Sequence, residues 1–221
     1  MQVGDLRLVG TTESIGGHFG QVKIVGECRL NGKVECGSFT CTGTSEVMGD
    51  FKAGLIKLTG ELTVNGSFAV ERGATTGEVR VRGGSRGDRL KVTGQLSVEG
   101  DCEYESLQAT GAVQVDGLLG AETLELRLHG PSRAREVGGG RIQIKRSRMA
   151  SIKKLFVSAG PISMAADLIE GDILDLEYTF AKVVRGNQVR LGPGCEIERV
   201  EYRQKLSKSG GAKVGTEAKI E

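Results

Sequence analysis

The fold is decided by the stretch Gln21–Gly54, which reads QVKIVGECRLNGKVECG followed by SFTCTGTSEVMGDFKAG. Glycine recurs at one fixed step, from Gly26 to Gly43 and onward to Gly111, and a second glycine series keeps the same step from Gly32 to Gly117. Two series locked to one period over six copies indicate a structural repeat. The architecture therefore follows from the repeat, before any single motif is considered.

Each copy of the repeat alternates apolar and polar residues, as Val22 and Ile24 do before the corner at Gly26. This alternation predicts strands with one buried face, and three short strands in each copy leave no room for a helix. Glycine supplies the positive φ that a tight corner needs. The sequence predicts an all-β fold: a single-stranded parallel β-helix with 17-residue coils of three strands each, whose coils lie about 4.8 Å apart.

One copy departs from the pattern of the repeat and invites a functional interpretation. In the fourth copy, Gly73 and Thr75 replace the first apolar pair and Ser85 replaces another core residue, while four arginines crowd the coil. We interpret this copy as a softer coil with solvated arginines, and a binding patch is the alternative.

Threonine precedes the corner glycine in five copies, which favours hydroxyl bonding along one column over a flat ice-binding face. The column comprises Thr42, Thr59, Thr76, Thr93 and Thr110.

The chain divides into five predicted regions. Residues 1–20 form an irregular first coil, 21–145 the β-helix core, and 146–166 a basic and apolar insertion. Alternation resumes in 167–203, which we expect to be further coils of the same β-helix. Residues 204–221 contain almost no apolar side chain, so we expect a disordered polar tail.

Composition excludes several classes of protein. The 221 residues carry 30 basic and 28 acidic side chains, a balance that does not favour nucleic-acid binding. The five cysteines show no paired spacing, and neither a signal peptide nor an apolar run of about 18 residues is present. We therefore expect a cytoplasmic protein with free thiols.

The sequence offers no catalytic constellation. Its two histidines, His18 and His129, lack neighbouring ligands, so neither a metal nor another cofactor is expected. The glycines are periodic corners rather than a phosphate-binding loop. We predict that the chain is not an enzyme. A discrete binding or adaptor module is the main alternative, and an acyltransferase-type β-helix enzyme is a further one.

A solenoid has two open ends, and repeat proteins that stay monomeric need polar caps there. No amphipathic helix precedes the first apolar pair, and the last apolar residues lead straight into the polar tail. Uncapped ends invite pairing with another copy, and head-to-head plus tail-to-tail contacts would yield a non-polar filament. The predicted polymer interface consists of Leu6 and Leu8 at one end and Ile197, Val200 and Tyr202 at the other.

The run Val22–Leu126, with its Val-x-Gly and Asn-Gly corners, resembles the bactofilins, which are polymer-forming bacterial cytoskeletal proteins. The resemblance covers about residues 6–203. Its C-terminal part is similar to the ending of a Firmicutes-type branch, in the segments Ile169–Asp172, Ala181–Gly186, Gly192–Ile197 and Val200–Tyr202. The resemblance implies a right-handed β-helix that polymerises without nucleotide as a scaffold beneath the cytoplasmic membrane. Partners would be the chain itself, a paralogous bactofilin or client proteins.

Many bactofilins carry an apolar and basic membrane motif at the N-terminus, of which Met1–Leu8 is a poor version. The insertion offers a substitute, because it holds basic and apolar residues side by side in a manner suited to anionic headgroups. A surface loop or short helix covering the side of the solenoid is the alternative. The predicted membrane contact comprises Met149, Ile152, Lys153, Lys154, Leu155 and Phe156.

Overall fold

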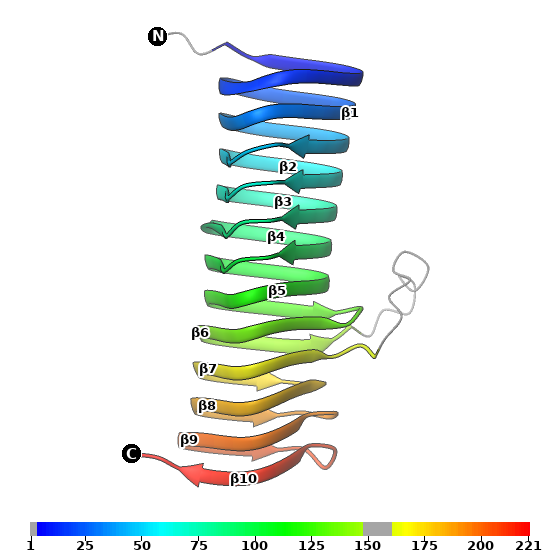
Figure 1. Cartoon of the computed structure of the whole chain (residues 1–221). Coiled ribbons are helices and arrows are strands. Elements are labelled where there is room, and N and C mark those ends of the chain that lie inside the picture. Colours follow the sequence, from blue (N-terminus) through cyan, green and yellow to red (C-terminus); the bar gives the residue numbers. More distant parts are fainter. Residues whose placement is uncertain (1–3, 148–160) are drawn as a thin grey trace. The chain divides into compact units, whose positions relative to one another are not determined.

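A computed structural model describes residues 4–147 and 161–221. The described residues form ten strands and no helix, which confirms the all-β prediction (Figure 1). The strands are β1 (Leu6–Val47), β2 (Phe51–Val64), β3 (Phe68–Val81), β4 (Ser85–Val98), β5 (Cys102–Leu128), β6 (Ser132–Arg146), β7 (Met164–Leu176), β8 (Thr179–Leu191), β9 (Glu196–Lys208) and β10 (Lys213–Lys219).

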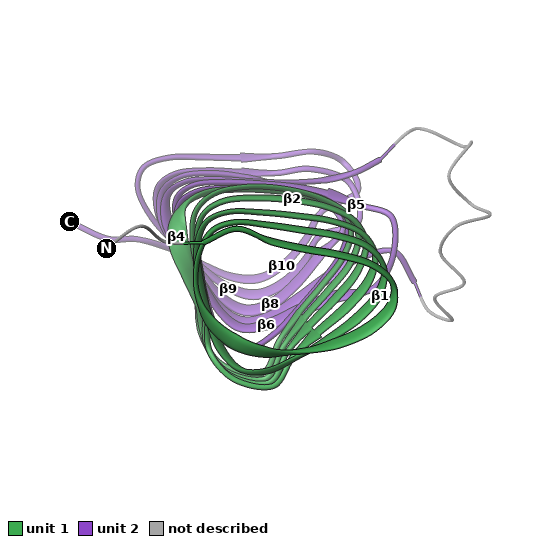
Figure 2. Ribbon diagram, turned by 90° about the horizontal axis from the view of Figure 1, so that it is seen from above, with its two compact units in different colours: residues 1–104 green, residues 105–221 purple. Residues whose placement is uncertain are grey.

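The chain forms two compact units, residues 1–104 and 105–221, which are described separately (Figure 2). In the first unit, β1 to β4 pair in parallel, and each residue lies beside its equivalent in the next copy of the repeat. One column of partners runs from Val34 through Phe51 and Phe68 to Ser85. The 17-residue coil predicted from the glycine series is therefore confirmed.

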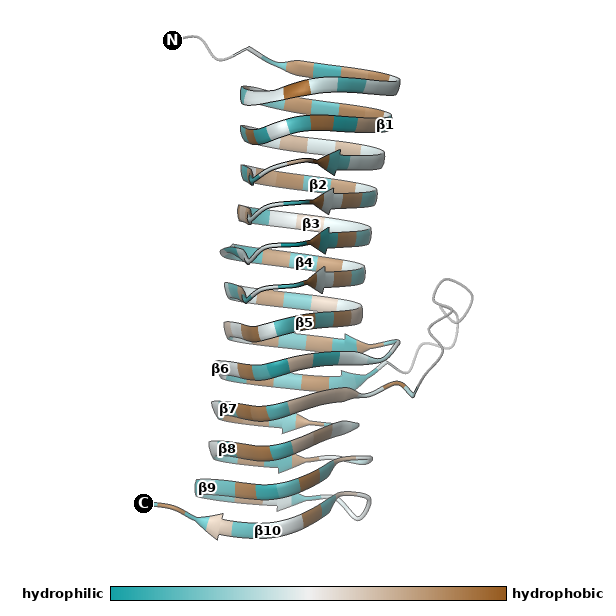
Figure 3. Cartoon of the chain, in the orientation of Figure 1, coloured by the Kyte–Doolittle hydropathy of each residue, from teal (hydrophilic) through white to brown (hydrophobic). Residues whose placement is uncertain are grey.

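The interior of the first unit is filled by the alternate residues of each strand, and hydropathy alternates along the strands accordingly (Figure 3). Leu30 and Ile56 are completely buried. Phe39 meets Phe51 edge to face at 5.0 Å between ring centroids, and Phe51 stacks on Phe68 at 5.3 Å. Offset and edge-to-face ring pairs add to the burial of apolar area. A phenylalanine stack therefore supports the aliphatic core here.

The corner glycines are required by the stacking of coils as well as by the turn. Gly60 has φ of +127°, and a Cβ there would lie 2.0 Å from the carbonyl oxygen of Gly43 in the preceding coil. Gly43 has the same relationship to Gly26, at 2.1 Å. Because each corner occupies the space above the previous one, any side chain at this position would push the coils apart.

The serine of the fourth copy is explained by a residue in the following coil. Tyr104 is buried, and its hydroxyl lies 2.8 Å from the Ser85 hydroxyl. Its ring would lie 3.0 Å from a Cβ at Gly87. The small serine therefore makes room for the tyrosine, while a Cβ at Gly87 would meet the Val70 carbonyl oxygen first, at 1.7 Å. The coil keeps its full backbone pairing on both sides of β3, so the lost apolar side chains do not interrupt the solenoid.

The second unit continues the parallel pairing with a less regular step. β7 pairs with β6 in parallel across the insertion, and then with β8 in a shorter coil that sets Met164 beside Thr179. β10 pairs with β9 in a longer coil, which sets Glu196 beside Lys213. The prediction that the solenoid resumes after the insertion is confirmed. The coil length varies here, which is why the glycine series ends near this unit.

The structure corrects the predictions for both ends of the chain. Residues 204–221 were expected to be disordered, yet they complete β9 and form β10. Backbone hydrogen bonds to the preceding coil order this segment, such as Lys213 N–H to the Cys195 carbonyl at 2.8 Å. That pairing does not depend on apolar side chains. The first coil, expected to be irregular, is already part of β1 from Leu6 onward.

Candidate interaction surfaces

The first turn of β1 exposes apolar side chains. Leu6 and Leu8, which the sequence predicts for the polymer interface, are half-buried. Val9 and Ile15 in the same turn are 63 % and 78 % exposed, the largest values for large apolar residues in the part of the chain that the structure describes. Sequence periodicity did not select them, because they lie at outward positions of a strand.

The residues predicted for the opposite end are not on the last coil. Ile197 and Val200 are 3 % and 0 % exposed, and Tyr202 is half-buried. β10 pairs alongside them, with Val214 next to Ile197 and Glu217 next to Val200. The prediction placed the end of the solenoid one coil too early, because it took the polar tail to be disordered.

The last coil instead carries an ion pair at two positions that face the core in the coils before it. Lys208 is the register partner of Leu191, and Glu217 is the register partner of Val200. Both of these partners are buried. The Lys208 ammonium contacts the Glu217 carboxylate, and both side chains are about two-fifths exposed. The interior of the solenoid therefore closes with charge at this coil, while β10 pairs with no strand beyond β9 among the described residues.

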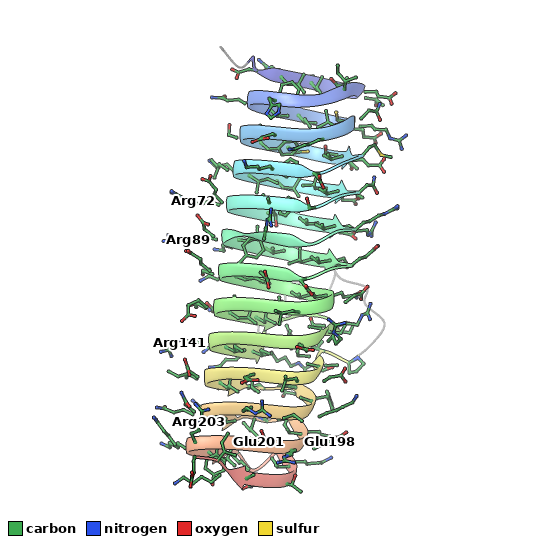
Figure 4. The ribbon with its side chains drawn as sticks, turned by 60° about the vertical axis from the view of Figure 1, so that its left-hand side comes forward. Arg72, Arg89, Arg141, Glu198, Glu201 and Arg203 are labelled. Carbon is green, nitrogen blue, oxygen red and sulfur yellow. The ribbon has the colours of Figure 1, made fainter. Side chains whose placement is uncertain are left out.

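A second charged cluster, centred on Glu201 (labelled in Figure 4), ties three strands of the unit together. Arg185 on β8 contacts Glu201 on β9 at 2.6 Å and Glu170 on β7 at 3.3 Å. Arg199 approaches the same Glu201 at 2.8 Å. The hydrogen bond from Arg185 is the main cause that lowers the pKa of Glu201, which is 11 % exposed. These contacts hold adjacent coils in register, and each acid of the cluster already has a basic partner.

The second unit also contains a shallow groove of about 920 Å³ that the sequence did not indicate. Phe180 lies in it and is 40 % exposed. Its neighbours in register are Ala165 and Glu196, and the small alanine leaves the ring uncovered on one side. Lys182 and Asp167 form a 2.7 Å ion pair on the same surface. The groove therefore combines an apolar contact with charges that already have partners.

The described thiols do not form a reactive site, and the His18 imidazole lies 3.4 Å from the Glu35 carboxylate, a neighbour that the sequence did not indicate. All five cysteines are buried and unpaired, as the repeat predicted for Cys28, Cys41 and Cys102. Burial raises the pKa of Cys36 and Cys41 to about 11 and that of Cys102 to about 12, so these thiols stay protonated at neutral pH. Among residues 4–147 and 161–221, no group of three His, Cys, Asp or Glu side chains is arranged to hold a metal ion.

The predicted membrane contact, Met149, Ile152, Lys153, Lys154, Leu155 and Phe156, lies outside the described residues. The strand before it ends at Arg146 and the strand after it begins at Met164. The segment between the strands is therefore shorter at both ends than the insertion predicted for 146–166. Within the part of the chain that the structure describes, no helix has the length and apolar character needed to cross a membrane.

Comparison with known proteins finds two curated relatives, both from Bacillus subtilis (strain 168). The chain is 39 % identical to the uncharacterized protein YhbE over 104 residues, which are 47 % of this chain and 43 % of YhbE. It is 42 % identical to the uncharacterized protein YhbF over 89 residues, which are 40 % of this chain and 35 % of YhbF. The chain thus spans less than half the length of either relative. No family model and no solved structure matches the chain.

Proposed function

We propose that this chain is a structural scaffold protein that assembles with copies of itself, without nucleotide, through the two edges of its solenoid. The assembly would be a filament, as the resemblance to bactofilins implies. We place it in the cytoplasm, near the inner face of the membrane. The exposed apolar first turn of β1 is the observation that supports this proposal most strongly.

The parallel pairing of coils explains how an edge can bind another copy. Each coil satisfies the backbone groups of the next, and the corner glycines leave space for the following coil. An edge strand with unpaired N–H and C=O groups is a template for further pairing. At the first turn, Leu6, Leu8, Val9 and Ile15 add apolar area to that template. A head-to-head contact through this turn would bury Leu6 and Leu8, with Val9 and Ile15 at its rim.

The other edge has a different chemical character. β10 presents backbone groups together with the Lys208–Glu217 ion pair, and its residues are mostly exposed and polar. A tail-to-tail contact would therefore depend on hydrogen bonds and charge. Since salt screens exposed charges, this contact should weaken as ionic strength rises, whereas the apolar contact should persist.

Negative-stain electron microscopy of the purified chain without nucleotide tests the proposal, together with sedimentation at low and high salt. We expect filaments at low salt and head-to-head dimers at high salt. Leu8→Arg combined with Val9→Arg should abolish the dimer while leaving the circular dichroism spectrum unchanged. A chain that stays monomeric under all of these conditions would contradict the proposal.

A discrete adaptor module is the second candidate, and the groove around Phe180 favours it. In that case the purified chain would be monomeric, and Phe180→Ser would abolish the binding of a partner without changing sedimentation.

For the membrane contact proposed at residues 149–156, liposome co-sedimentation of a Lys153→Glu, Phe156→Glu variant is the direct test. A partition coefficient that both substitutions leave unchanged would contradict that contact.

A further inference from the structure

One side of the first unit has an unusual distribution of charge. Residues 21–104 contain eleven basic and eleven acidic side chains, so the segment as a whole is neutral. The sheet face made by residues 21–25, 38–42, 55–59, 72–76 and 89–93 nevertheless has five basic residues and no acidic one. We call it the basic face. Its basic residues are Lys23, Lys57, Arg72, Arg89 and Lys91, all exposed.

The strand register places these residues in columns along the solenoid. Arg72 and Arg89 are direct partners on β3 and β4, and they project from the same side of the stack (Figure 4). Lys57 and Lys91 are separated by one coil bearing Ala74, so their backbones lie about 10 Å apart. The exposed threonine column Thr42, Thr59, Thr76 and Thr93 runs beside the lysines. The face is therefore flat, hydroxylated and cationic.

The basic side chains of this face differ from those of the other faces in their ion pairs. On the other faces, several basic side chains pair with an acid in the adjacent coil, as Arg29 does with Glu46 at 2.8 Å and Lys52 with Glu35 at 2.9 Å. Among the described residues, no ion pair involves any of the five basic residues of the basic face. Their positive potential is therefore available to an external anion.

The shape and composition of the basic face favour a planar anionic partner. Its exposed positions hold no aromatic or histidine side chain on which a base could stack, which argues against single-stranded nucleic acid. Leu55 and Val25 are 39 % and 43 % exposed on this face, and apolar side chains beside lysines suit the boundary between headgroups and acyl chains. Because the sheet face is rigid, its basic and threonine columns can all contact a flat partner at the same time.

We propose that the basic face binds the anionic headgroup surface of a lipid bilayer, with the axis of the first unit parallel to the membrane. The contact uses the sides of the coils, so it does not depend on the proposed self-assembly. It is also separate from the insertion at 146–166. Each basic residue near an anionic membrane contributes a free energy equivalent to about a fivefold change in partitioning.

Vesicle co-sedimentation of the full chain tests this inference, with vesicles of phosphatidylglycerol mixed with phosphatidylcholine against vesicles of phosphatidylcholine alone. We expect binding to the anionic vesicles only, weakened by salt. Lys23→Gln, Lys57→Gln and Lys91→Gln together should reduce partitioning on the order of a hundredfold, by the fivefold effect per residue. Thr59→Glu with Thr76→Glu, which removes no lysine, should also reduce it.

The matched control is Arg29→Gln, Lys33→Gln and Lys52→Gln, which removes the same charge from the other two faces. This variant should bind the anionic vesicles nearly as well as the wild type does. Equal losses in the two triple variants would show a simple net-charge effect and overturn the inference. Equal binding to the phosphatidylcholine vesicles would also overturn it, as would tighter binding to duplex DNA or to polyglutamate than to the anionic vesicles.

Discussion

Lys208 and Glu217 form an ion pair at two register positions that Leu191 and Val200 occupy in the preceding coil. In every other coil of the second unit these two positions hold buried aliphatic side chains. Examples are Ile144 with Val137 in one coil and Leu176 with Ile169 in the next. Replacing both apolar residues by opposite charges closes the interior without an extra helix. The last coil thus presents a charged rather than an apolar edge, so the tail-to-tail contact proposed above rests on charge and backbone hydrogen bonds.

Replacing the pair by the residues of the preceding coil, Lys208→Leu with Glu217→Val, should make this edge apolar. We expect stronger self-association that no longer weakens with salt, measured by sedimentation velocity. The stability of the isolated fold should change by no more than about 1 kcal/mol, because the pair is exposed. The swapped pair Lys208→Glu with Glu217→Lys is the control and should sediment as the wild type does.

The corner glycines predict a difference between two alanine substitutions. Gly32→Ala meets only the strain of a positive φ, since nothing lies within 4 Å of the added Cβ, and should cost about 1–2 kcal/mol. Gly60→Ala adds a contact of 2.0 Å with the Gly43 carbonyl oxygen and should cost about 1–3 kcal/mol more. Urea unfolding measures both free energies, and equal values would contradict the stacking argument.

The buried hydrogen bond between Tyr104 and Ser85 can be tested by a double-mutant cycle. Tyr104→Phe removes this hydrogen bond and leaves the buried Ser85 hydroxyl only its weaker contact with the Cys102 sulfur, which should destabilise the fold by about 1–3 kcal/mol. Adding Ser85→Ala removes the stranded hydroxyl and should restore part of that loss. If the double variant is less stable than the single one, the hydroxyl pair is not the interaction that matters.

The cluster around Glu201 predicts a pH dependence of stability. Because Arg185 lowers the pKa of Glu201 in the folded chain, the ionised carboxylate stabilises the fold above its unfolded pKa of about 4.3. This contribution is lost as pH falls from that value through the lower folded pKa. Arg185→Gln should therefore lower the melting temperature at pH 7 and have progressively less effect below about pH 4. Thermal melts over this pH range, with Arg190→Gln as an exposed control, measure the effect.

Local chemistry was sufficient to predict the first unit. Alternation set which residues face the interior, and the corner glycines set the coil length, so residues such as Val22 and Leu62 were assigned to the core correctly. The reason is that every coil contacts only its neighbours, which reduces the fold to one repeated local rule. The role of Tyr104 in the fourth copy was not predictable, because its partner Ser85 lies in the preceding coil and out of register with it.

The ends and the surface depended on tertiary structure. β10 has too few apolar residues to be recognised as a strand, and only its backbone pairing with β9 shows that the last coil exists and that Ile197 and Val200 lie beneath it. The basic face could likewise not be predicted from the composition, because the segment is neutral as a whole. Its basic residues come together on one face only when the coils stack. The sequence by itself determined a parallel solenoid with a 17-residue coil, because side-chain alternation and glycine corners act locally. Which side chains remain free to meet a partner was decided by the stacking of coils, because pairing across coils uses some charges and leaves others exposed.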